Sequence, residues 1–205
     1  EGAVALGANS SASGVNAIAI GNRTSATYDN SFAFGPGATA KGIGAGAIGS
    51  NAKSTGANAM AIGVGATASN DSSFALGTNA TASGEDSSAF GVNATASGTN
   101  AIAVGTNATS SGTNALAFGA GALGDQANSF VVGAAAQACG VNAGAIGANA
   151  QAKGANSIAI GVSSYAKEDG SMALGTNANA SGASSTAIAI NAQAVGANSL
   201  AAGVG

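Results

Sequence analysis

A single repeat of fourteen residues runs through the whole sequence without an insertion or a deletion. It is marked by a glycine that follows each short apolar run, at residues 7, 21, 35, 49, 63, 77, 91, 105, 119, 133, 147, 161, 175 and 203, with Ala189 as the exception. Helical repeats need about 33 residues or more for two helices and their turns. Fourteen residues accommodate two short strands and two tight turns, so the repeat predicts a β-solenoid in which each repeat forms one coil.

Two alternating segments lie within each coil. With the repeat glycine as position 0, positions 11 and 13 are mostly bulky and apolar, as in Ile158 and Ile160, and position 12 is alanine except at Val131. Positions 3 and 5 are small and positions 4 and 6 are polar, as in Thr81 and Ser83. A period of two predicts strands with two different faces. Glycine at position 0, and again at position 7 in ten of fourteen coils, predicts the turns.

The charged residues indicate which face of each strand meets solvent. After Glu1 they occur only at positions 2, 4 and 6 to 9, so positions 4 and 6 are predicted to face outward and positions 3 and 5 inward. We expect positions 11 and 13 to fill the interior, because two sheets meeting through alanine alone would lie too close for the turns. The outer strip at positions 10, 12 and 0 would then form an interface between chains, at Ala19, Ala33, Ala61, Ala75, Ala103, Ala117, Ala159 and Ala173. The opposite arrangement, with positions 11 and 13 toward a partner, stays open.

Composition argues against several other classes of protein. The chain is 46% hydrophobic with a net charge of −3, which is not the composition of a disordered segment. No run approaches the roughly 20 apolar residues of a membrane-spanning helix, and five basic residues argue against a nucleic-acid partner. Without histidine and with scattered acids, the sequence predicts no enzyme, no metal and no cofactor. The single cysteine, Cys139, excludes an intrachain disulfide and is predicted to be a free outward thiol at position 6.

The segment from Asn156 to Ser164 resembles the NSVAIG-x-x-S repeat in the heads of YadA-like trimeric autotransporter adhesins. Segments 16–21, 58–63 and 100–105 are close variants, and the resemblance extends over essentially all 205 residues. It implies an all-β, left-handed parallel β-roll of about fourteen coils, one head domain over residues 1–205, and a parallel homotrimer. It also implies a bacterial surface protein anchored in the outer membrane through a C-terminal region outside this sequence. Because the pattern begins and ends within a repeat, we expect a fragment of a longer protein.

The resemblance further implies a non-enzymatic virulence protein that attaches bacteria to host extracellular matrix or host cells. No motif of the family encodes the ligand, but four coils replace the position-7 glycine with a larger residue. These residues and one outward tyrosine are candidate ligand contacts: Tyr28, Asn70, Gln126, Tyr165 and Glu168. The alternative interpretation of the four substitutions is tolerated variation at a turn. Two other functions stay open: an ice-binding solenoid, because threonine and serine form partial ladders at positions 4 and 6, and a passive spacer in a surface fibre.

Overall fold

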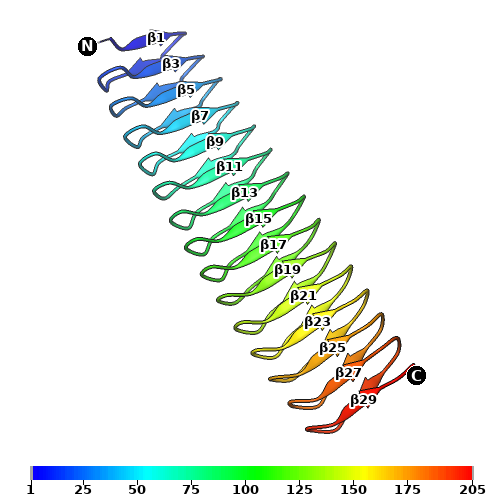
Figure 1. Cartoon of the computed structure of the whole chain (residues 1–205). Coiled ribbons are helices and arrows are strands. Elements are labelled where there is room, and N and C mark those ends of the chain that lie inside the picture. The colour runs from blue at the N-terminus through cyan, green and yellow to red at the C-terminus, as the bar shows by residue number, and fades with distance from the viewer. Residues whose placement is uncertain (1, 205) are drawn as a thin grey trace. The chain divides into compact units, whose positions relative to one another are not determined.

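The structure is a computed structural model that describes residues 2–204. The chain divides after Ala101 into two compact units, and each unit is a parallel β-solenoid built from coils of fourteen residues. A coil contains one strand of three residues and one strand of two residues. In Figure 1 the three-residue strands carry the odd numbers, and they follow one another in chain order within each unit.

The first unit contains the strands β1 to β14. Its three-residue strands are β1 (Val4–Leu6), β3 (Ile18–Ile20), β5 (Phe32–Phe34), β7 (Gly46–Ile48), β9 (Met60–Ile62), β11 (Phe74–Leu76) and β13 (Ser88–Phe90). Its two-residue strands are β2 (Ser11–Ala12), β4 (Ser25–Ala26), β6 (Thr39–Ala40), β8 (Lys53–Ser54), β10 (Thr67–Ala68), β12 (Thr81–Ala82) and β14 (Thr95–Ala96).

The second unit contains the strands β15 to β29. Its three-residue strands are β15 (Ile102–Val104), β17 (Leu116–Phe118), β19 (Phe130–Val132), β21 (Gly144–Ile146), β23 (Ile158–Ile160), β25 (Met172–Leu174), β27 (Thr186–Ile188) and β29 (Leu200–Ala202). Its two-residue strands are β16 (Thr109–Ser110), β18 (Leu123–Gly124), β20 (Gln137–Ala138), β22 (Gln151–Ala152), β24 (Tyr165–Ala166), β26 (Asn179–Ala180) and β28 (Gln193–Ala194).

Strands pair in parallel with the equivalent strand one coil away, and the register is one repeat. In the second unit Gly144 pairs with Ile158, and Ile158 pairs with Met172. The backbone N–H of Ile158 donates to the carbonyl of Ser171 at 2.9 Å, and the N–H of Gly144 donates to that of Ser157 at 2.9 Å. Each coil therefore satisfies the backbone groups of its neighbour, which is why the fold needs many similar coils.

Asparagine and glycine form the turns because these turns require a left-handed backbone. Asn142 and Asn156 have φ angles of 57° and 56°, a region that asparagine tolerates better than most residues. Their side chains form part of a ladder, in which the Asn142 amide donates to Asn156 Oδ1 at 3.0 Å. Gly147 has a φ of 125°, and a Cβ atom there would lie 2.6 Å from the carbonyl oxygen of Gly161. The repeat glycine is therefore required both by its φ angle and by the close approach of the next coil.

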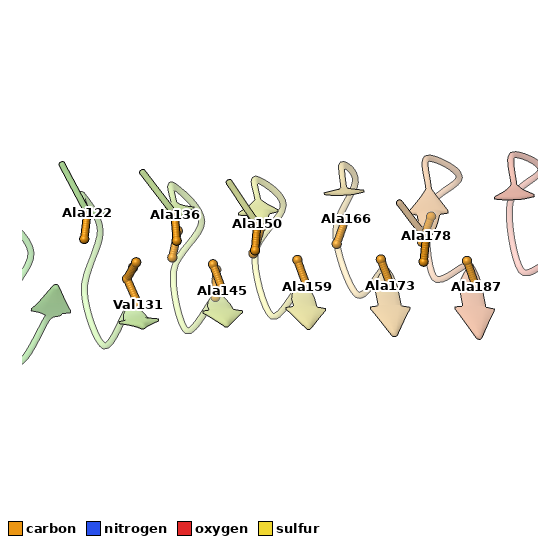
Figure 2. Packing of buried hydrophobic residues seen from close by; sticks show 14 of the residues in the cluster. Ala122, Val131, Ala136, Ala145, Ala150, Ala159, Ala166, Ala173, Ala178 and Ala187 are labelled. Carbon is orange, nitrogen blue, oxygen red and sulfur yellow. The ribbon is translucent and has the colours of Figure 1, made fainter. Parts of the chain in front are cut away.

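Alanine side chains from the two sheets fill the interior of each coil. In the second unit the buried cluster includes Ala122, Val131, Ala136, Ala145 and Ala159. Figure 2 shows these side chains pointing toward one another across the space between the two sheets. Each buried methyl group contributes only about 0.8 kcal/mol. The stability of such an interior therefore depends on its repetition over many coils.

The predicted orientation of the two-residue strands is confirmed, and the predicted orientation of the three-residue strands is wrong. Positions 3 and 5 face inward, as Ala150 and Ala152 are fully buried, and Lys153 at position 6 is exposed. Position 12, which was expected outside, also faces the interior, whereas Ile160 at position 13 is 40% exposed. All eight alanines predicted as a chain interface are 0% exposed: Ala19, Ala33, Ala61, Ala75, Ala103, Ala117, Ala159 and Ala173. These alanines are enclosed by their own coil and cannot contact another chain.

The tight turns explain why alanine suffices as a filling. In the turn from Gly140 to Ala143, the N–H of Ala143 donates to the Gly140 carbonyl at 3.2 Å. On the other edge, the N–H of Ala150 donates to the Gly147 carbonyl at 3.1 Å. Turns closed over three residues hold the two sheets near enough for methyl groups to meet, so no bulky side chain is needed between them.

Candidate functional site

The outward side of the three-residue strands carries the largest apolar side chains of each unit. We call this surface the apolar face; it consists of the side chains at positions 11 and 13. In the second unit Phe118 is 51% exposed, Phe130 is 43% exposed and Ile160 is 40% exposed. An exposed apolar surface of this kind is typical of a region that associates with another molecule.

The apolar face carries no charged residue among the residues that the structure describes. All charges of residues 2–204 lie at positions 2, 4 and 6 to 9, and the polar exceptions at position 11 are the small residues Ser88 and Thr186. Depletion of charge at the centre of a contact surface distinguishes protein interfaces from the remaining surface. The absence of charge at positions 11 and 13 is visible in the sequence and could have identified this face. We instead expected these side chains in the interior, because we expected a larger separation between the two sheets.

Within each unit the candidate ligand contacts lie on surfaces other than the apolar face, at positions 4 and 7 of their coils. Tyr28 is 51% exposed in the first unit, where Asn70 is also exposed. In the second unit Gln126 is exposed, whereas Tyr165 and Glu168 are half-buried. A binding role for these five residues stays a prediction.

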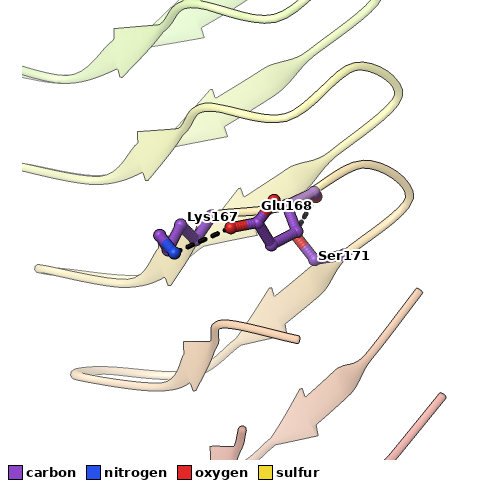
Figure 3. A network of polar contacts seen from close by, with 3 residues as sticks. All are labelled: Lys167, Glu168 and Ser171. Carbon is purple, nitrogen blue, oxygen red and sulfur yellow. Dashed lines mark hydrogen bonds and ion pairs between the residues drawn. The ribbon is translucent and has the colours of Figure 1, made fainter. Parts of the chain in front are cut away.

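Tyr165 and Glu168 take part in local polar contacts within the second unit. Lys153 Nζ lies 5.3 Å from the centroid of the Tyr165 ring, a distance suited to a cation–π interaction. Lys167 Nζ lies 2.7 Å from Glu168 Oε1, and this ion pair raises the pKa of Lys167, first through its hydrogen bond and then through its charge. Figure 3 shows this pair beside Ser171, whose hydroxyl donates to the Glu168 carbonyl at 2.5 Å.

Three of the four turns without glycine at position 7 have an aspartate at position 8 that bonds to the preceding coil. Asp169 Oδ1 accepts the backbone N–H of Ala155 at 2.8 Å. Asp29 and Asp71 make the equivalent bond with the preceding coil, also at 2.8 Å. These contacts give the altered turns a structural role, because each carboxylate satisfies a backbone donor one coil away.

Cys139 has a half-buried thiol on the outward side of the coil, directly after β20, and is free. Burial raises the pKa of this thiol, the charge of Asp125 raises it further, and Lys153 opposes the shift. A thiol that stays protonated is a weak nucleophile. This environment does not favour a reactive cysteine.

A surface depression of about 290 Å³ in the first unit is lined by Asn70, Asp71 and Glu85. Its volume is at the lower limit of the range usual for small-molecule sites. Among residues 2–204 no group of three or more histidine, cysteine, aspartate or glutamate side chains is placed to hold a metal ion. The same residues include no helix long and apolar enough to cross a membrane.

The fold and the surface together define a class of protein: a parallel β-solenoid of short coils that presents one uncharged apolar sheet face. The profile of the YadA head domain repeat (2 copies) matches residues 1–24, 26–53, 54–80, 82–108, 96–122, 138–164 and 166–188, so the chain belongs to this family of heads of trimeric autotransporter adhesins. Members of the family are in general non-enzymatic, surface-exposed proteins anchored in the outer membrane.

The chain is also similar to a solved structure, the crystal structure of the collagen-binding domain of the Yersinia adhesin YadA, with 24% sequence identity and a TM-score of 0.38. The similarity covers 74% of this chain and 69% of that chain. No curated protein matches the chain.

Proposed function

We propose that this chain is a non-enzymatic adhesin head that assembles as a parallel homotrimer and attaches bacteria to host extracellular matrix or host cells. The observation that carries this proposal is the apolar face, where residues such as Phe118 and Ile160 are 51% and 40% exposed. In an isolated chain this apolar surface is exposed to water, which is unfavourable. Association of copies through the apolar face would bury it. The left hand of the coil and a single head over residues 1–205 belong to the same proposal.

The outward flank of the coils at positions 2 to 9 is the proposed binding surface. This surface carries hydroxyl and amide groups together with occasional lysines such as Lys153. In a homotrimer each contact is presented three times, and avidity can then exceed single-site affinity by about 10²–10⁴. Weak polar contacts are therefore sufficient for attachment.

Attachment tests the proposal directly. The chain is displayed on a non-adherent bacterium, and binding to collagen, fibronectin, laminin and epithelial cells is measured. We expect a gain on at least one of these surfaces, and we expect it to be lost when Ile160→Asp breaks the assembly. Display at the normal level without a gain on any surface would refute the adhesive role and would favour a passive spacer in a surface fibre.

A further inference from the structure

Three basic residues lie in successive coils of the first unit. Lys53 is in β8, Lys41 directly follows β6, and Arg23 lies in the turn before β4. All three side chains are exposed, and we call them the basic patch. Residues 21–62 contain one acidic residue, Asp29, so they carry a net charge of +2 in a chain whose net charge is −3. Positive charge is therefore concentrated on one part of an acidic chain.

The basic patch is not neutralised by its own chain. Among residues 2–204 the one ion pair joins Lys167 to Glu168, in the second unit. The Asp29 carboxylate accepts the backbone N–H of Val15 at 2.8 Å, so it is held against the preceding coil. The other acidic residues described in the first unit lie in later coils: Asp71, Glu85 and Asp86. The lysines of the patch are thus free to bind an anion from outside the chain.

Hydroxyl groups surround the two lysines of the patch. The strands β4, β6 and β8 pair in register, so that Ser25 lies beside Thr39 and Thr39 beside Lys53. Thr55 stands at the position of the repeat that Lys41 takes one coil earlier. Adjacent strands lie about 4.8 Å apart and two residues span about 6.6 Å, so the two lysines are attached to the sheet about 8 Å apart. An elongated ligand can therefore contact both amines and the hydroxyls between them.

We propose that the basic patch binds an anionic polysaccharide, whose sulfate or carboxylate groups contact Lys41 and Lys53. This inference rests on the proposed attachment to host surfaces, for which it names a class of ligand. Neutralising a polyanion releases its counterions, which makes binding favourable and dependent on salt. Sugar hydroxyls find partners in Ser25 and Thr39. Tyr28, which is 51% exposed next to the patch, offers an aromatic ring to the apolar side of a sugar.

The surroundings of the patch favour a polysaccharide over a nucleic acid. Single-stranded nucleic acids are bound by successive aromatic side chains along a basic surface. Residues 21–62 place one exposed tyrosine, Tyr28, at the patch and hydroxyl groups at the remaining outward positions of the strands. The patch also lies on the side of the coil opposite the apolar face. Association through the apolar face leaves every copy of the patch accessible, so one long polysaccharide can contact more than one copy.

Two double variants that remove the same charge test the patch. Lys41→Thr with Lys53→Thr places at each position the residue of a neighbouring coil, so the fold is retained. Lys153→Ser with Lys167→Ser is the control in the second unit, where both lysines already have partners. Binding to immobilised heparin, a sulfated polysaccharide, is measured by surface plasmon resonance, and circular dichroism verifies that each variant is folded. We expect the first pair to lower the affinity about tenfold and to weaken its salt dependence, and the control pair to change neither.

Three results would overturn the inference. A wild-type chain without measurable binding to heparin has no such site. Equal losses for the two double variants would mean that net charge alone explains the binding. Double-stranded DNA that binds as tightly as heparin at the same ionic strength would show a general affinity for polyanions instead of a polysaccharide site.

The outcomes also separate this inference from the adhesive function on which it rests. Displayed chains that attach bacteria to host surfaces, but do not bind heparin, would refute the polysaccharide site alone. Heparin binding that the Lys41→Thr and Lys53→Thr pair removes, in a chain that confers no attachment, would refute the adhesive role and support the site.

Discussion

Aspartate introduced at two neighbouring residues of β23 distinguishes the interior of the coil from the apolar face. Ala159 is 0% exposed and lies between the two sheets, whereas Ile160 is 40% exposed on the outward side of the same strand. Ala159→Asp places a carboxylate among the alanine methyl groups of the interior, which offer it no hydrogen bond. Ile160→Asp places the same carboxylate in the solvent around an isolated chain.

The burial of the two residues sets the size of each effect. An unpaired buried charge costs roughly 3–5 kcal/mol, so Ala159→Asp is expected to lower the free energy of unfolding by that amount at any protein concentration. Ile160 keeps about 60% of its surface covered within the chain, since it is 40% exposed, so its loss costs about 1–2 kcal/mol. In a homotrimer Ile160→Asp also brings three like charges into the interface, so we expect dissociation to folded monomers.

Urea unfolding followed by circular dichroism, at two protein concentrations, separates these effects. The wild type is expected to unfold at higher urea when it is more concentrated, because dissociation and unfolding are coupled. Ile160→Asp should remove this dependence on concentration, and Ala159→Asp should unfold at lower urea at both concentrations. Wild-type stability for Ala159→Asp, together with unfolding by Ile160→Asp, would place position 12 outside and refute the orientation described above.

Three further predictions concern the turns and the thiol. Ala189 has a φ of 104° at a position that is otherwise glycine, so Ala189→Gly should raise the free energy of unfolding by about 1 kcal/mol, measured by urea unfolding; a decrease would contradict this. Asp169→Ala removes the acceptor of the Ala155 N–H and should cost about 1 kcal/mol in the same assay, while Asp169→Asn keeps an acceptor and serves as the control. Burial and then Asp125 raise the pKa of Cys139, so alkylation of the native protein should increase only at a pH above the ordinary thiol range. Asp125→Asn should shift this increase to lower pH, and no shift would show that burial alone is responsible.

The candidate site shows how much of the surface could be predicted. The polar side was predicted from the position of charges such as Lys153, because a lysine at position 6 cannot be buried without a partner. The bonding role of Asp169 was not predicted, because it depends on an amide fourteen residues away that only the stacking of coils brings close. The different surroundings of Gly46 and Gly144 were also not predicted: neighbouring side chains cover Gly46, and no heavy atom outside its chain neighbours lies within 4 Å of where a Cβ atom of Gly144 would be. Gly46 and Gly144 occupy equivalent positions in the repeat, and the conformations of neighbouring side chains decide which of them is filled.

The sequence by itself determined the length of the coil, the two alternating strands and the place of the turns, and each follows from local chemistry. Glycine and asparagine mark left-handed turns, and a period of two marks a strand. Only the tertiary structure decided which side of the three-residue strand faces the interior. The alternation of bulky and small residues is the same whichever side faces inward. In β23, Ile158 and Ile160 lie on one side of the strand and Ala159 on the other, and this pattern does not say which side is buried. The separation of the two sheets settles the choice, because turns this tight leave room for methyl groups and force the larger side chains outward.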